Sequence, residues 1–372
     1  MRIDAPVAGA HVLGYMESDF LGFSPANAAV SSNSNSLRLR LYWVNLKKGK
    51  YEILGGQSWS LLTPNRRGLS ALPSDLFYTQ NIDVNYQAGL IWSRNPGVRF
   101  IYHPKPTVAL GVSLEASEQY GGGSAGGGAI TLPAALTSAY ANEVNLGSTT
   151  FNVANPAPDV ITKIAFDPAI GQKSAHFEIA GVLSAFKLYN PLSQRSYSAT
   201  GGGGSFNFSI ETWRNLRLIA NNYASSGGGR WIFGQGPDLI VRGDGSASLI
   251  HAYSTLDGLE YQATPDALLY GYYSNAYFQR NSAIDPSNGK PVGYGYTGSP
   301  NSQNRSIQEV TFGVTRTFWK NPAFGALQLM GQYSYLLREP WFVTTGQPRS
   351  AHGNLFFLNL RYALPGAPPA TE

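Results

Sequence analysis

The sequence predicts an all-β fold, a transmembrane antiparallel β-barrel, and three observations carry this prediction. First, apolar and polar residues alternate along many segments, as in strands that have two different faces. Second, short and long connections alternate between these segments, which is typical of bacterial outer-membrane barrels. Third, only 13% of the 372 residues are charged, about half of the usual quarter, and no segment approaches the ~18 apolar residues of a membrane helix.

The clearest alternation lies in residues 37–43. One expected face holds Leu37, Leu39, Leu41 and Trp43, and the other holds Arg38, Arg40 and Tyr42. Similar patterns place about 14 strands of roughly nine to twelve residues, the length that crosses a bilayer when tilted. The predicted strands are 11–22, 37–46, 51–59, 98–103, 107–117, 159–167, 174–187, 205–213, 216–224, 253–263, 267–278, 305–318, 324–338 and 353–364.

The long connections between these strands are rich in Gly, Ser and Asn. They are 23–36, 60–97, 118–158, 188–204, 225–252, 279–304 and 339–352. Their glycine runs, such as Gly201–Gly204, are expected in flexible outer loops. Two segments are ambiguous. Asp257-Gly258 is a common hairpin turn, but a turn there would break the alternation of connections, so 253–263 is predicted as one strand. Residues 84–93 also alternate and are an alternative strand within a long connection.

Aromatic residues cluster near the ends of the predicted strands. This fits girdles at the two membrane interfaces, although aromatic residues also favour strands in general. The residues are Tyr15, Trp43, Trp59, Tyr102, Tyr120, Trp213, Tyr270, Tyr272, Trp319, Tyr335 and Tyr362.

Composition and motifs exclude several kinds of function. The chain has no Cys, which excludes disulfides, zinc-thiolate sites and iron–sulfur clusters. The net charge of +5 is too mild to predict a nucleic-acid partner. The G-x-S-x-G match at 122–126 lies in a glycine run with no helix pattern after it, so no nucleophile elbow is expected. Five scattered His residues show no metal motif. We therefore expect neither an enzyme nor a cofactor.

Three short stretches resemble DcaP-like outer-membrane porins, within the phosphate-selective-porin type. Residues 14–22, 37–42 and 55–60 match that family's successive E-x-D-F, LR and GQ-[ST]-W strands, and 94–99 resembles its R-x-P-x-[VL]-R segment. The overall pattern of residues along the chain is similar to that of porin-like proteins of acidobacterial genomes. The resemblance implies a trimeric porin of about 16 strands in which the E-x-D-F strand is third. It therefore implies that two upstream strands and the signal peptide are absent from this chain.

Charged residues on two neighbouring predicted strands are candidates for the pore wall. Glu17 and Asp19 share one strand face, and Arg38 and Arg40 share the polar face of the next strand. Antiparallel pairing would bring these four side chains together as a charge ladder. Such a ladder would set up a transverse field at a constriction. The alternative is a structural network in the wall that has no part in selectivity.

The long connection 60–97 is the second candidate. By analogy with the family's inward-folding loops, it is expected to narrow the lumen and to present Arg66, Arg67 and Arg94. The alternative is a surface loop that faces lipopolysaccharide. Arg99, Arg217 and Arg361 also fall on predicted inward faces. Guanidinium groups along a water-filled path attract carboxylates and phosphates.

The sequence therefore predicts a single barrel domain over residues 1–372, with a short C-terminal tail at 365–372. The predicted function is an outer-membrane porin through which small hydrophilic solutes diffuse passively, with a modest preference for anions such as carboxylates. The expected partners are membrane lipid, lipopolysaccharide, the small solutes, and two further copies of the chain in a homotrimer. Two alternatives remain: a secreted β-sheet protein that binds carbohydrate or acts as an adhesin, and an outer-membrane barrel hydrolase that acts on lipid.

Overall fold

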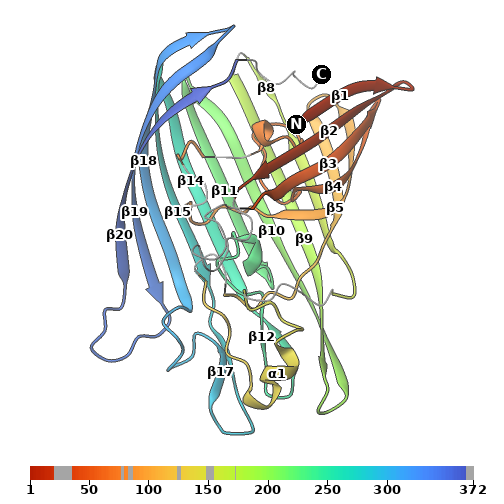
Figure 1. Ribbon diagram of the computed structural model, residues 1–372, viewed down its shortest axis with the longest axis vertical. Coiled ribbons are helices and arrows are strands. Elements are labelled where there is room, and N and C mark those ends of the chain that lie inside the picture. The colour runs from red at the N-terminus through yellow and green to blue at the C-terminus, as the bar shows by residue number, and fades with distance from the viewer. Residues whose placement is uncertain are drawn as a thin grey trace.

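One antiparallel sheet curls around the molecule in the computed structural model (Figure 1). The structure describes residues 1–20, 36–76, 79–82, 87–123, 127–147, 155–171 and 173–365. Fifteen strands in this part of the chain follow one another along the sheet, and each pairs with the next. Short turns gather at the upper end of the view in Figure 1, and the long connections gather at the lower end.

The strands along this path have the following bounds: β1 (Arg2–Val7), β2 (Ala10–Asp19), β3 (Arg38–Lys48), β4 (Tyr51–Trp59), β5 (Arg94–Lys105), β6 (Val108–Glu115), β7 (Asp159–Phe166), β9 (Lys173–Asn190), β10 (Arg195–Trp213), β11 (Leu216–Ser226), β14 (His251–Thr264), β15 (Ala267–Phe278), β18 (Asn304–Asn321), β19 (Gly325–Pro340) and β20 (Ala351–Ala363). The two-residue strand β8 (Ala169–Ile170) pairs with β9 alone. Strands β1 and β20 end the path, and no ladder joins them in the described residues.

All the predicted strands are present, and 253–263 is confirmed as a single strand, β14. One expectation about the start of the chain is wrong, because β1 precedes the strand that was expected to come first and pairs with it from Arg2 to Val7. The suggested strand at 84–93 is not observed over 87–93, and residues 83–86 lie outside the described part of the chain.

The prediction that residues 188–204 form a loop is wrong, because strands β9 and β10 continue through most of this segment. Gly201 to Gly204 pair with β9 on one side, and Gly202 to Gly204 pair with β11 on the other. Close packing explains these glycines: a Cβ on Gly201 would lie 2.6 Å from the carbonyl oxygen of Ser226 and 3.0 Å from the ring of Phe186. Their role is therefore close approach within a sheet rather than loop flexibility.

The faces of β3 follow the prediction only up to a β-bulge. The register between β2 and β3 shifts where Glu17 pairs with Leu41 and the next residue pairs with Leu39, which leaves Arg40 as the extra residue. A bulge of this kind reverses the alternation beyond it. Leu41 and Trp43 are therefore buried inside, whereas Tyr42 is exposed on the outward face. The prediction that Leu41 and Trp43 share a face with Leu39 is wrong.

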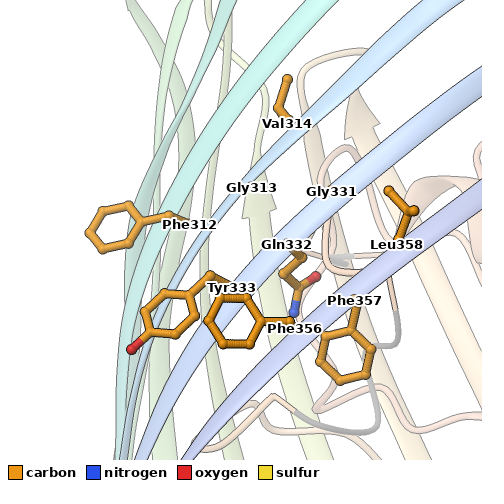
Figure 2. A pocket seen from close by; sticks show the side chains of 9 residues that line it. All are labelled: Phe312, Gly313, Val314, Gly331, Gln332, Tyr333, Phe356, Phe357 and Leu358. Carbon is orange, nitrogen blue, oxygen red and sulfur yellow. The ribbon is translucent and has the colours of Figure 1, made fainter.

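Elsewhere the outward face is a band of exposed apolar side chains. Val112 and Leu114 on β6 are exposed while Ser113 and Glu115 between and after them are buried, as the alternation predicts. The same pattern holds on β18 and β20. A hollow of about 540 Å³ lies on this face of β18 to β20, and Figure 2 shows the side chains that line it. Phe312, Tyr333 and Phe356 line it, and the ring centroids of Tyr333 and Phe356 are 4.8 Å apart.

The aromatic girdles are confirmed only in part. Trp213, Trp319, Tyr335 and Tyr362 are exposed near strand ends, as expected. Five other members of the predicted set are wrong, because their rings are buried in the interior; these are Trp43, Trp59, Tyr120, Tyr270 and Tyr272. Nearness to a strand end therefore does not by itself place an aromatic ring at a membrane interface.

The long connections carry small elements of their own. Two hairpins, β12 (Leu239–Val241) with β13 (Ala247–Leu249) and β16 (Asn281–Ile284) with β17 (Pro291–Tyr294), lie at the lower end of Figure 1 beside the one-turn helix α1 (Thr137–Tyr140). Short 3-10 turns are η1 (Pro73–Asp75), η3 (Ala134–Leu136) and η4 (Gly229–Trp231). Among the described residues, no helix has the length and apolar character needed to cross a membrane.

Candidate solute pathway and its arginine pocket

The connection between β4 and β5 lies inside the curled sheet. We call its described residues (60–76, 79–82 and 87–93) the inner loop. Its backbone N–H groups donate hydrogen bonds to inward-facing side chains of the wall. Five of these bonds, 2.7–3.2 Å long, reach acceptors on β6, β9, β11, β18 and β19: Glu115, Glu178, Asn221, Glu309 and Gln332. Because these strands surround the interior, the loop crosses it, and its predicted inward folding is confirmed.

Apolar contacts hold the same loop from other directions. Leu72, Leu76 and Leu90 of the inner loop pack in one buried cluster with Leu41 of β3 and Leu256 of β14. Burial of each such side chain contributes about 1.5–3 kcal/mol. The inner loop is therefore a packed part of the interior as well as a hydrogen-bonded one.

Arg66 of the inner loop is fixed by a carboxylate of the wall. Its guanidinium group donates two hydrogen bonds, of 2.9 and 2.5 Å, to Glu260 of β14. The hydroxyl of Tyr272 donates a third bond of 2.9 Å to the same carboxylate. Burial disfavours the charged guanidinium, but Glu260 outweighs it and raises the pKa of Arg66. This arginine is an anchor whose charge is already balanced.

Four of the other arginines predicted to line the pore lie apart from one another in the structure. Arg67 is exposed on the inner loop. Arg99 is buried on β5 and donates to the carbonyl oxygen of Trp59 at 2.6 Å. Arg217 on β11 donates to two serine hydroxyls, at 3.0 and 2.6 Å. Arg361 is exposed near the end of β20. These side chains form no single cluster.

The predicted charge ladder forms, with ion pairs between β2 and β3. Arg38 donates to both oxygens of Asp19, at 3.0 and 2.6 Å. Arg40 lies 2.7 Å from Glu17 and 2.9 Å from Asp19. The bulge at Arg40 explains the double contact, because the extra residue places its side chain between the two carboxylates. All four side chains are partly exposed, so each pair contributes little to stability.

Arg94, at the start of β5, joins this ladder to a polar pocket of about 510 Å³. The guanidinium carbon of Arg94 lies 5.4 Å from the ring centroid of Trp59, a cation–π distance. Trp59 in turn stacks on Trp92, with ring centroids 4.2 Å apart. Within the described residues, no carboxylate forms an ion pair with Arg94. The pocket is lined by Arg38, Trp59, Trp92, Arg94, Glu118, Arg230 and Phe233, among others.

Sequence reasoning missed Arg230 and Phe233, which come from the connection between β11 and β14. Arg230 forms ion pairs with two buried carboxylates, those of Asp159 and Asp238. These carboxylates raise the pKa of Arg230, although burial opposes it. Phe233 has a φ of +50°, a strained conformation for a bulky residue, and its ring lies 5.6 Å from that of Trp92. Nothing in the local sequence pattern marks either residue, since only folding brings three connections together here.

No group of three or more acidic or histidine side chains suited to a metal ion occurs among the described residues. Residues 124–126 of the G-x-S-x-G match lie outside the described part of the chain.

The curled antiparallel sheet, its apolar outward face and its polar inward wall define the class: a transmembrane antiparallel β-barrel of the outer-membrane kind. Among solved structures, the chain is similar to the outer membrane channel DcaP of Acinetobacter baumannii, with a TM-score of 0.68 and 19% identity over 98% of this chain and 83% of that one. It is also similar to OprB of Pseudomonas putida, with a TM-score of 0.52 and 12% identity over 95% and 83% of the two chains. The fold is thus the one the resemblance to DcaP-like porins predicts, and the outer membrane is the location that it and the apolar outward face indicate.

No protein-family model matches the chain. No curated protein matches it either.

Proposed function

We propose that the protein is a porin, through which small hydrophilic solutes diffuse passively, and that it prefers anions such as carboxylates. The observation that carries the anion preference is Arg94. Its guanidinium group lines the polar pocket beside Arg38 and has no ion-pair partner among the described residues. Arg38, Arg66 and Arg230 are each balanced by carboxylates. Arg94 therefore supplies the positive charge that a passing anion meets.

The surroundings of Arg94 strengthen its effect on an anion. Trp59 and Trp92 are buried, and they leave one side of the guanidinium group against apolar rings instead of water. A charge beside a surface of low dielectric constant acts over a longer range than one surrounded by water. Glu118 is the acidic residue of the same lining, and Asn145 donates a hydrogen bond to it. An anion at Arg94 can thus be attracted without being held permanently.

Planar-bilayer recording tests this proposal. In a salt gradient, the purified protein is expected to conduct and to give a reversal potential on the anion-selective side. A reversal potential at zero or on the cation-selective side would contradict the anion preference. Absence of any conductance from a folded, inserted protein would contradict the porin role itself.

The outward face favours this function over a secreted carbohydrate-binding protein. Phe356, Leu358 and Leu360 on β20 are 68–79% exposed, and such a surface needs a membrane or a partner to cover it. A protein that remains monodisperse without detergent would contradict the membrane assignment. We also propose the homotrimer that the sequence resemblance implies. Chemical crosslinking in detergent micelles tests it, with a trimer band as the expected product and a monomer alone as the contrary result.

A further inference from the structure

Trp341 is held in one position at the long-connection end of the sheet. It follows β19, and its indole N–H donates a 2.9 Å hydrogen bond to the carbonyl oxygen of Phe278. Its backbone N–H donates to the carbonyl oxygen of Gln303 at 3.0 Å. Gly295 has a φ of +73°, and a Cβ there would lie 2.6 Å from the indole ring. These contacts leave the indole little freedom to move.

Two exposed arginines converge on this ring. The guanidinium carbon of Arg280 lies 6.0 Å from the ring centroid of Trp341, and that of Arg305 lies 5.9 Å from it. Both are within cation–π range. Neither forms an ion pair with a carboxylate among the described residues, so two like charges meet at one ring.

The neighbouring charged groups leave these two charges unbalanced. Glu339, which precedes Trp341 by two residues, accepts a 2.8 Å hydrogen bond from the hydroxyl of Ser306. Arg338 is a third cation of this rim, and it donates to the side-chain oxygen of Asn304 at 2.5 Å and to the carbonyl oxygen of Asn301. Two positive charges that share one ring repel each other, and a bound anion would reduce that repulsion.

The position of Trp341 in the fold indicates which class of anion would bind beside Arg280 and Arg305. Its ring makes an edge contact with Tyr277 at 6.1 Å, and Tyr277 lies 6.1 Å from Tyr253. Tyr253 is exposed on the outward face of β14, between inward and buried Ala252 and Ser254. A row of aromatic rings that ends in Trp at one rim of the outward face is typical of the headgroup level of a membrane. In outer-membrane barrels, the end with the long connections faces the outer leaflet.

We propose that Arg280 and Arg305, braced by Trp341, bind a phosphate group on the headgroup of an outer-leaflet lipid. Guanidinium groups bind phosphate oxygens through paired, charge-assisted hydrogen bonds. The fixed indole keeps both groups in place before the lipid arrives, which lowers the entropy lost on binding. None of these three residues lines the Arg94 pocket, so the proposed site is separate from the proposed solute pathway.

Lipid binding to the purified protein in detergent micelles tests the site. The probes are bis-phosphorylated lipid A, the same lipid without its phosphates, and inorganic phosphate. The double variant Arg280→Gln/Arg305→Gln is expected to bind bis-phosphorylated lipid A about tenfold more weakly than the original protein, a change of about 1.4 kcal/mol. The matched control is Arg316→Gln, an exposed arginine at the opposite end of β18 whose guanidinium donates to Thr264. This control is expected to bind the lipid unchanged.

Three results would overturn the proposal: unchanged lipid binding by the double variant, equal binding of the lipid without phosphates, and inorganic phosphate that binds as tightly as the lipid. If the double variant fails to fold, as judged by its mobility on gels with and without heating, the single variants Arg280→Gln and Arg305→Gln carry the test. Each is then expected to bind about threefold more weakly. No conductance enters this assay, so its failure leaves the proposed porin function untouched.

Discussion

The guanidinium group of Arg94 lies over the ring of Trp59, with 5.4 Å between the guanidinium carbon and the ring centroid. The two residues belong to neighbouring strands, and they are directly paired in the register of β4 and β5. Trp59 also stacks on Trp92 of the inner loop. The tryptophan pair therefore connects the wall, the inner loop and the charged group that faces the pocket.

Removing the charge of Arg94 is expected to weaken anion selectivity. Arg94→Gln keeps a polar, shorter side chain but removes the unbalanced charge, so the anion-to-cation permeability ratio should fall by about twofold or more. The reversal potential in a salt gradient measures this change. Arg214→Gln, at an exposed turn residue, is the matched control and should leave the ratio as it was. An unchanged ratio in Arg94→Gln would place the selectivity elsewhere in the pathway.

Neutralising Glu260 is expected to loosen the inner loop. Glu260→Gln leaves the guanidinium group of Arg66 buried without its charge partner, which costs about 3–5 kcal/mol for a fully buried pair. Because the Arg66 side chain is still 21% exposed, we expect a smaller loss, of about 2 kcal/mol. Single-channel recordings should show a noisier current, and limited proteolysis should cut the loop faster. Quiet channels with unchanged proteolysis would contradict this anchoring role.

The bulge in β3 predicts which side chains meet lipid. The chain has no Cys, so single cysteine variants can carry a spin label without background. A label at Val44→Cys should be accessible to oxygen dissolved in the bilayer, because Val44 is 54% exposed on the outward face. A label at Asn45→Cys, the next residue along the strand, should be shielded from it. The reverse order of accessibility would show that the alternation continues without a bulge.

Burial makes the carboxylates around Arg230 sensitive to pH. The Asp238 side chain is buried, and burial raises its pKa to about 7 although Arg230 opposes the shift. An aspartate in an unfolded chain has a pKa of about 3.9. The folded state therefore binds the extra proton between about pH 4 and 7, and stability falls as pH rises through that range.

From pH 5 to pH 8 we expect the protein to lose about 2–3 kcal/mol of stability from this group. Thermal unfolding in detergent at the two pH values measures the loss. Asp238→Asn should flatten the dependence, whereas Asp266→Asn, at an exposed turn, should not. A steep dependence that survives in Asp238→Asn would rule out this aspartate as its source.

Replacing Gly201 is expected to destabilise the sheet, although the residue was predicted to lie in a loop. Gly201→Ala places a Cβ 2.6 Å from a carbonyl oxygen of β11, and overpacking of this kind costs about 1–3 kcal/mol. The control is Gly353→Ala on β20, where a Cβ would meet no atom within 4 Å. The difference in thermal unfolding temperature between the two variants measures the effect, and equal temperatures would contradict the close packing of β10.

The sequence by itself predicted fourteen of the fifteen strands along the sheet and most of their faces, because each side chain in a strand must turn either toward lipid or toward the interior. That local rule needs no partner, and it holds along β6, over residues 309–315 of β18 and over residues 354–360 of β20. It also brought Glu17 and Asp19 opposite Arg38 and Arg40, since neighbouring antiparallel strands connected in sequence pair directly.

Only the tertiary structure decided where the alternation of faces reverses and which side chains come together in the interior. The bulge at Arg40 depends on the pairing of β2 with β3, so the pattern of β3 alone does not reveal it. The pocket of Arg94 needs Trp92 from one connection and Phe233 from another. Contacts between residues so distant in the chain depend on how whole connections fold back into the barrel, and side-chain periodicity carries no information about that.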